Sequence, residues 1–369
     1  MQLIYENEEI RIGNGFPSLV RFFQGNSTKP LVVFFPGWAH LGRISYGFPG
    51  CNKKHFLGHY LTQKGYPFLA TSYPIDHPVY DHVYPEFTLT DWGKMAAEIT
   101  NQFILENALP KEVIGISWSA AGQVIRPFNV ACKFLGINVR FHLGLEASPA
   151  LLIPSDRTIG MKKTEKGMVS LKDSHYELFW KEIEEQNELN REEFITKEKY
   201  FTDLLGDIPV ALMGTNERFE NGHFDTNIEK SFEDKNFFAF TEYPLIANIS
   251  GDSKLASYHP IVDKVTWGFL ITRKVYHDYF VKNQESLSKI SDANFKELVE
   301  YVNDIPNRLH SSISGNHFLF VGRYGAQKIA DNVEHFDKEI QEIEQELKTF
   351  LRWIFQISKL RRKSFLYNI

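Results

Sequence analysis

The sequence predicts an α/β protein with a doubly wound, mostly parallel sheet and an inserted helical cap. Short β-type runs alternate with helical patterns up to about residue 150, and this alternation returns from about residue 243. Strands separated by helices of this length form βαβ units, which build parallel sheets. The intervening segment, 151–242, carries strongly charged helical patterns typical of an insertion folded over a sheet. We therefore expect a core formed by 1–150 and 243–369, with a cap or lid at 151–242.

The first core part alternates regularly. Its expected strands are residues 19–23, 31–35, 67–73, 113–116 and 139–145. Helical patterns fill the gaps at 55–64, at 91–107 and from the serine-containing turn after 116 to about 135. The run Thr88-Leu-Thr90-Asp91 supplies the second helix with an N-terminal cap. Ligands of such sheets bind beyond the carboxyl ends of the strands, so functional residues are sought there.

The remaining elements are less regular. Residues 172–206 have charged helical patterns, and 208–214 form a strand-like run inside the cap. An apolar strand is expected at 244–250, followed by helices through 301. A last strand is expected at 308–313 and a charged helix at 326–357.

Composition limits the function. Hydrophobic residues are 43% and charged residues 24% of the 369, as in ordinary globular enzymes. The net charge of −5 argues against a general nucleic-acid binder, which needs a basic field to displace counterions from phosphates. The surplus of 31 Phe and 16 Tyr suits a protein that handles an apolar ligand. We expect a small-molecule substrate, whereas the oligomeric state cannot be predicted.

Cysteine usage and the first residues indicate a compartment. Cys51 and Cys132 are the only cysteines, so no disulfide framework is expected and a reducing compartment is the simplest. The acidic start of the chain lacks the basic and apolar blocks of a signal peptide, and no apolar run reaches membrane-spanning length. We expect a cytoplasmic protein without stable membrane insertion.

No cofactor or metal is expected. His and Asp/Glu residues do not cluster at the short spacings of metal ligands. Neither a phosphate-binding glycine-rich loop nor a dinucleotide fingerprint occurs.

The segment Gly115-Ile-Ser117-Trp-Ser119-Ala-Ala-Gly122 has the form of a nucleophile elbow. A serine at a sharp strand-to-helix turn needs a small residue two places before it and small residues two and three places after. Either Ser117 or Ser119 satisfies this rule. Ser119 is the better candidate because close packing of the following helix on the sheet explains Gly122. Ser117 remains the alternative nucleophile.

A serine hydroxyl needs a base to take its proton, and the base needs an acid to orient it. His317 is the candidate base because it follows the last expected strand and the flexible Ser-Gly-Asn turn at 314–316. Asp252 is the candidate acid because it ends the preceding strand. Glu217 and Glu146, which also follow apolar runs, are alternative acids.

Acyl chemistry also needs hydrogen-bond donors for the oxyanion. The strand at 31–35 opens into Pro36-Gly37-Trp38, a turn near the start of the domain. In the elbow architecture one donor is the amide after the nucleophile and the other comes from such a loop. The backbone N–H groups of Trp38 and Ala120 are therefore the candidate donors.

Taken in chain order, the elbow, the Pro-Gly loop before it, the Gly251-Asp252 strand end and Asn316-His317 resemble the α/β-hydrolase superfamily over about residues 29–335. The chain departs from the superfamily pattern in two places. Pro36-Gly37 stands where His-Gly is usual, and Ala or Ser stands where the residue two places after the nucleophile is usually Gly. The resemblance implies an α/β-hydrolase-type sheet with an inserted helical cap.

The resemblance also implies an activity. We expect a serine hydrolase of the carboxylesterase or thioesterase kind, which cleaves an ester or thioester with an apolar acyl group through Ser119, His317 and Asp252 and an acyl-enzyme. An acyltransferase that uses the same acyl-enzyme is the first alternative. The second is a non-catalytic protein of the same fold that binds a ligand or a partner.

Overall fold

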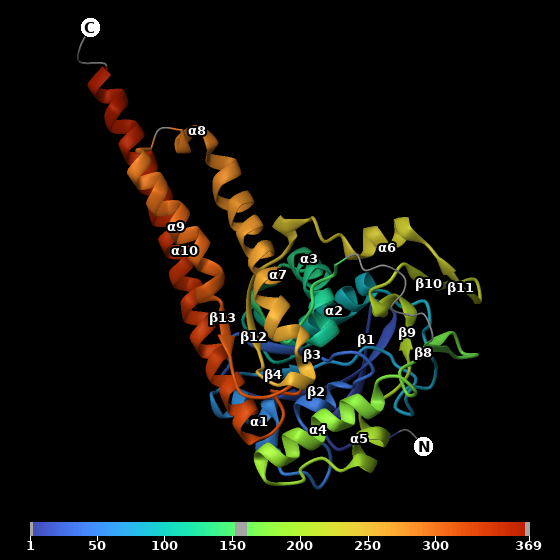
Figure 1. Ribbon diagram of the computed structural model, residues 1–369. Coiled ribbons are helices and arrows are strands. Elements are labelled where there is room, and N and C mark those ends of the chain that lie inside the picture. The colour runs from blue at the N-terminus through green and yellow to red at the C-terminus, as the bar shows by residue number, and fades with distance from the viewer. Residues whose placement is uncertain (1–2, 152–160, 289, 366–369) are drawn as a thin grey trace.

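An eight-stranded sheet forms the centre of the molecule, which is a computed structural model describing residues 3–151, 161–288 and 290–365 (Figure 1). The strand order is β1-β2-β4-β3-β5-β6-β12-β13. β2 pairs antiparallel with β1 and β4, and the other neighbouring strands are parallel. The strands are β1 (Glu8–Gly13), β2 (Phe16–Phe23), β4 (Phe68–Ala70), β3 (Leu31–Phe35), β5 (Glu112–Trp118), β6 (Asn138–Leu145), β12 (Leu245–Ser250) and β13 (His310–Ser312).

Helices cover both faces of this sheet. Adjacent residues of a strand point to opposite faces, and the ring of Phe35 on β3 packs against Trp92 and Phe128, which lie on α2 and α3. Phe34 points to the other face and contacts Phe320, just before α10. The core helices are α1 (Leu57–Gln63), α2 (Leu89–Glu106), α3 (Ile125–Phe134), α7 (Tyr258–Val275), α8 (Gln284–Leu287), α9 (Asp292–Arg308) and α10 (Arg323–Phe365). The predicted doubly wound α/β class is confirmed.

The described part of the chain between β6 and β12 lies against the loops that follow β3 and β4, where Leu205 bridges His40 and Asp207 bridges Asp76. It contains helices α4 (Tyr176–Asn190), α5 (Lys197–Asp203) and α6 (Ile228–Lys235). It also contains a three-stranded sheet and a hairpin, formed by β7 (Lys162–Lys163), β8 (Met168–Ser170) and β9 (Ile208–Pro209), and by β10 (Glu217–Glu220) and β11 (His223–Thr226). The division of the chain at 151–242 stays a prediction.

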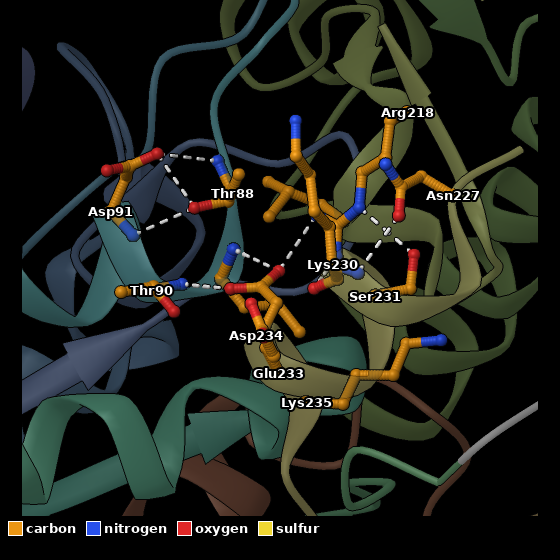
Figure 2. Close-up of polar contacts among 12 residues, drawn as sticks. Thr88, Thr90, Asp91, Arg218, Asn227, Lys230, Ser231, Glu233, Asp234 and Lys235 are labelled. Atoms are coloured by element: carbon orange, nitrogen blue, oxygen red, sulfur yellow. Dashed lines mark hydrogen bonds and ion pairs between the residues drawn. The ribbon is translucent and has the colours of Figure 1, made fainter. Parts of the chain in front are cut away.

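One polar cluster ties this part to the core (Figure 2). The carboxylate of Asp234 on α6 accepts a hydrogen bond of 2.7 Å from the backbone N–H of Thr90, in the first turn of α2. The same carboxylate pairs with Arg218 of β10 at 2.9 Å. Both side chains are buried. An acidic side chain at a helix N-terminus complements the unpaired amides and the helix dipole there, so α6 is fixed to α2.

Two expected strands turn out differently. Only Phe68–Ala70 of the expected 67–73 pairs in the sheet, as β4. The strand-like run at 208–214 forms β9 over two residues and then a 3₁₀ turn, Val210–Met213, which ends at Gly214 with φ +77°. This run is buried throughout, and a short buried apolar run has no periodicity that distinguishes strand from helix.

A helical arm projects from the sheet (Figure 1). It is formed by the far ends of α7 and α9 with α8 between them, and α10 runs alongside α9. Among the described residues, no helix combines the length and the apolar character needed to span a bilayer.

Candidate active site

Ser119 follows β5 directly and is the first residue of the 3₁₀ segment Ser119–Val124, which leads into α3. Its backbone has φ +58°, a left-handed conformation that is unfavourable for residues with a side chain. The turn is crowded, because a Cβ built on Gly37 would lie 2.8 Å from the Cβ of Ser119. The backbone bends sharply at this residue, and the Ser119 side chain lines a cavity at the end of β5.

Ser117 lies in a different environment. It is fully buried on β5, and its Oγ is 3.3 Å from Nδ1 of the buried His142. Packing here needs a glycine two places earlier, since a Cβ on Gly115 would come within 2.1 Å of the His142 ring. Ser117 therefore lies against the core, whereas Ser119 lines a cavity.

A chain of hydrogen bonds starts at Ser119. Its Oγ lies 2.8 Å from Nε2 of His317, and Nδ1 of His317 lies 3.1 Å from Oε2 of Glu146. The carboxylate of Glu146 is fully buried and His317 is nearly so. The three side chains come from the ends of β5 and β6 and from the loop after β13. Their arrangement is that of a nucleophile, a base and an orienting acid.

Asp252, the acid preferred from the sequence, is not part of this hydrogen-bonded series. Its carboxylate accepts hydrogen bonds from Ser314 Oγ at 2.9 Å and from the Gly315 N–H at 3.0 Å. Asp252 therefore holds the loop that carries His317 and does not touch the imidazole. Glu217 is also elsewhere, at the start of β10, where it pairs with Lys163. Of the three acids considered, the structure places Glu146 beside His317.

Glu146 can reach His317 because neighbouring strands end together. β6 and β12 are adjacent and parallel, and Oε1 of Glu146 accepts a 2.7 Å hydrogen bond from the N–H of Gly251 at the end of β12. A Cβ on Gly251 would lie 2.7 Å from Glu146 Oε1 and 2.2 Å from the Gly315 carbonyl oxygen. Gly251 at the end of β12 thus leaves room for Glu146, which comes from the neighbouring strand β6.

Gly122 gives the first testable prediction. A Cβ at this position would lie 2.4 Å from the carbonyl oxygen of Ser148, in the loop that follows Glu146. We expect Gly122→Ala to lower the free energy of unfolding by about 1–3 kcal/mol, because backbone has to move to make room. Gly144→Ala is the matched control, since its Cβ would meet its nearest neighbour at an ordinary 3.4 Å. Thermal and urea unfolding measure both, and equal stability of the two variants would contradict the prediction.

The two proposed oxyanion residues border the same cavity as Ser119 and His317. The Pro-Gly loop is held in place by two hydrogen bonds. Tyr73 donates its hydroxyl to the Gly37 carbonyl at 2.9 Å, and Trp38 donates its indole N–H to the Leu212 carbonyl at 2.8 Å. The loop after β3 and the first turn after Ser119 thus meet at the cavity, where the backbone N–H groups of Trp38 and Ala120 remain our candidate donors.

Two neighbours of His317 were not singled out from the sequence. Trp118 donates its indole N–H to the His317 carbonyl at 2.7 Å and so ties the elbow to the histidine loop. The ring of His259, from the first turn of α7, stacks on the His317 ring with centroids 4.7 Å apart and planes 16° apart. Nδ1 of His259 lies 3.0 Å from the buried carboxylate of Asp263. One turn of helix separates His259 from Asp263, but only the fold brings His259 to His317.

Burial sets the charges of the site. It lowers the pKa of His317 well below its ordinary value, and the nearby charge of His259 lowers it further. Burial also raises the pKa of Glu146 to about 7. Burial therefore favours a neutral imidazole at His317, which is the form that can accept a proton from Ser119.

We expect the fall of kcat/KM on the acidic side of its pH profile (the acidic limb) to follow the protonation of the His317 imidazole. Activity should be lost as pH falls through the pKa of His317, because the protonated ring cannot act as a base. His259→Gln removes the electrostatic effect by which His259 lowers the pKa of His317, so this pKa should rise and the limb should move to higher pH. Glu146 still faces the ring, and burial already favours the neutral form of Asp263. The exposed His335→Gln is the control, and an unmoved limb in His259→Gln would contradict the prediction.

One group in the described part of the chain could offer ligands to a metal ion. Glu146, His259 and His317 have ligand atoms within 4.8 Å of one another. Local sequence spacing does not reveal this group because its members are far apart in the chain. A metal held there would compete for the Glu146 and His317 atoms that already contact each other.

No family model and no curated protein matches this chain. Solved structures do match in fold. An esterase from Thermogutta terrifontis has a TM-score of 0.53 with 8% identity, over 90% of this chain and 99% of the esterase. An AqdC variant, which cleaves the ring of the Pseudomonas quinolone signal, has a TM-score of 0.52 with 11% identity, over 91% and 99% of the two chains. At these identities the likeness concerns the fold.

Proposed function

We propose that this chain, which has the α/β-hydrolase fold, is a serine hydrolase that cleaves an ester or thioester through an acyl-enzyme. One observation carries this proposal: the hydroxyl of Ser119, at a strained elbow, lies 2.8 Å from an imidazole whose other nitrogen faces a buried carboxylate. A serine becomes nucleophilic at neutral pH only with such a base.

The proposed reaction has two halves. Ser119 Oγ attacks the substrate carbonyl while Nε2 of His317 takes its proton, and Glu146 stabilises the imidazolium. The backbone N–H groups of Trp38 and Ala120 donate to the oxyanion. His317 then returns the proton to the leaving alcohol or thiol, which leaves the acyl group on Ser119. In the second half, Nε2 of His317 takes a proton from water as the water oxygen attacks the acyl carbonyl. His317 then returns this proton to Ser119 Oγ as the bond between Ser119 and the acyl group breaks, which releases the acid and restores the free serine.

The substrate cavity has a volume of about 530 Å³ and a partly apolar wall that includes Phe179 and Leu178 of α4. This wall supports the expected apolar character of at least part of the substrate. The fold alone does not choose the reaction, because the two similar proteins described above are an esterase and a ring-cleaving protein.

Covalent labelling tests the proposal. We expect a fluorophosphonate probe at micromolar concentration to modify the protein once, with the adduct located on Ser119 by peptide mass spectrometry. Nitrophenyl esters and acyl thioesters should be turned over with release of the free acid. Transfer of the acyl group to added alcohols or amines instead of water would favour an acyltransferase, and absence of labelling would favour a non-catalytic binding protein.

A further inference from the structure

Glu182 contributes a carboxyl group to the proposed substrate cavity. It lies on α4, the cap helix over the carboxyl ends of the strands, and lines the same 530 Å³ cavity as Ser119 and His317. Only 3% of its surface is exposed. Carboxyl groups are almost never buried to this degree unless they are paired.

The position of Glu182 is fixed relative to the proposed base. The side-chain N–H₂ of Asn316, the residue before His317, donates to the Glu182 carbonyl oxygen at 2.7 Å and to the Glu185 carboxylate at 2.6 Å. Gln186 on the same helix donates to the Asn316 side chain at 3.0 Å. Helix α4 is therefore bound to the histidine loop, and Glu182 is held at a set place above the site.

The carboxyl of Glu182 makes no hydrogen bond or ion pair with any described residue. None of the described residues that line the cavity is a lysine or an arginine. The carboxyl oxygens of Glu182 are not among the fully enclosed atoms that lack a partner, so they open onto the cavity that Glu182 lines. Because no described residue pairs with them, the carboxyl group is available to a ligand that enters the cavity.

The surroundings favour a cation as that ligand. Burial, with the charges of Glu146 and Glu185, raises the pKa of Glu182 to about 8. The same charges that oppose ionisation of Glu182 attract a positive group. The cavity wall also includes the aromatic rings of Trp38 and Tyr258, whose faces bind cations.

Building on the proposed hydrolase function, we infer that Glu182 is a specificity-determining residue, which binds a protonated amine on the substrate. The substrate class is then an ester or thioester that combines an apolar body with a cationic amine. Ser119 attacks the carbonyl carbon, the acyl C–O or C–S bond breaks, and Glu182 holds the amine in the same cavity.

Binding of such a substrate should be coupled to release of a proton. Burial raises the pKa of Glu182 to about 8, so its carboxyl group is mostly protonated at pH 7 when no cation is near it. An ammonium group favours the carboxylate, so binding displaces the proton and affinity rises as pH increases toward 8. Glu146, Glu185 and His259 also face this region, and His317 and His175 border the cavity. The pH dependence of catalysis that these groups cause also applies to a neutral substrate of the same shape. Binding of that neutral substrate does not release the proton of Glu182.

Matched esters test the inference. We would compare the 4-nitrophenyl ester of trans-4-(aminomethyl)cyclohexanecarboxylic acid with that of trans-4-ethylcyclohexanecarboxylic acid. On the leaving-group side, S-(2-dimethylaminoethyl) thioacetate, whose amine is protonated, would be compared with S-(3-methylbutyl) thioacetate. In at least one pair, kcat/KM should be about tenfold to hundredfold higher for the cationic member, as expected for a charge-assisted contact. The preference should grow as pH is raised from 6 to 8.

Variants assign the preference to Glu182. Glu182→Gln keeps the shape and removes the charge, so it should abolish the preference and leave turnover of the neutral ester within about threefold. Glu184→Gln, at an exposed position of the same helix, should keep the preference. Should Glu182→Gln fail to fold, calorimetric titration of the wild-type protein with trans-4-(aminomethyl)cyclohexanecarboxamide in buffers of different ionisation enthalpy would measure the released proton.

Three results would overturn the inference: no preference for either cationic member, a preference that survives Glu182→Gln, or amide binding without proton release. If Glu182→Gln lowered kcat/KM equally for the cationic and the neutral ester, Glu182 would have a structural role and the inference would be overturned as well. Failure of the hydrolase proposal looks different, because then the fluorophosphonate would not label Ser119 and neither ester of a pair would be cleaved. The calorimetric measurement still decides the role of Glu182 in that case.

Discussion

Replacing Ser119 with alanine should reduce kcat/KM for activated esters by about 10³-fold or more, while replacing Ser117 should leave most of the activity. Ser119 is the serine within 2.8 Å of the proposed base, and Ser117 faces His142 inside the core. Ser119→Ala should also lose labelling by the fluorophosphonate. Initial rates with 4-nitrophenyl esters measure the difference.

Ser117→Ala is the matched control, because it removes the same hydroxyl from a residue two places away. It loses only a weak 3.3 Å contact, so its free energy of unfolding should fall by about 1 kcal/mol or less. If Ser117→Ala were inactive while Ser119→Ala retained turnover, the other register of the elbow would be the correct one. Circular dichroism of both variants excludes unfolding as the cause of a lost activity.

Replacing Glu146 with glutamine should reduce kcat by about 10²- to 10⁴-fold, the scale on which other serine hydrolases respond to a neutralised triad acid. An amide in place of the carboxylate no longer stabilises the imidazolium that forms when Ser119 attacks. The Gly251 N–H can still donate to the side-chain oxygen of Gln, so the local fold should be kept. Single-turnover kinetics would separate slower acylation from slower release of the acyl group.

Asp252→Asn separates the two acids. Asp252 holds Ser314 and Gly315 and does not touch His317, so this variant should retain activity within about tenfold and lose about 1 kcal/mol of stability. If Asp252→Asn lost as much kcat as Glu146→Gln, the assignment of Glu146 as the orienting acid would be wrong.

The fold class could be predicted because the local signals are strong. The strand expected at 31–35 coincides with β3, and the helix expected at 91–107 corresponds to α2, where Thr88 and Asp91 form the capping box. Antiparallel β1 was not expected, since its pairing with β2 depends on the turn between them. The run at 208–214 could not be assigned correctly because it is buried on all sides.

The parts of the candidate site that follow from local patterns and their order in the chain could be predicted. An elbow serine and a histidine after the last strand follow from local patterns, and the structure brings Ser119 and His317 together. The acid depends on which neighbouring strand end reaches the imidazole. Glu146 and Asp252 each follow an apolar strand, and only the spatial order β6-β12 and the space left by Gly251 distinguish them. Glu182 and His259 come from helices whose positions sequence patterns do not specify.

The origin of Glu146 at the end of β6 has a consequence for how the chain can vary. The proposed nucleophile and acid lie on the adjacent strands β5 and β6, within 28 consecutive residues from Ser119 to Glu146. The strand ends that follow, β12 and β13, then have to supply only the histidine loop and its supports. The long helical arm between them can therefore change in length at its far end, around α8, without separating the acid from the nucleophile. The proposed nucleophile and acid thus do not depend on the length of the arm.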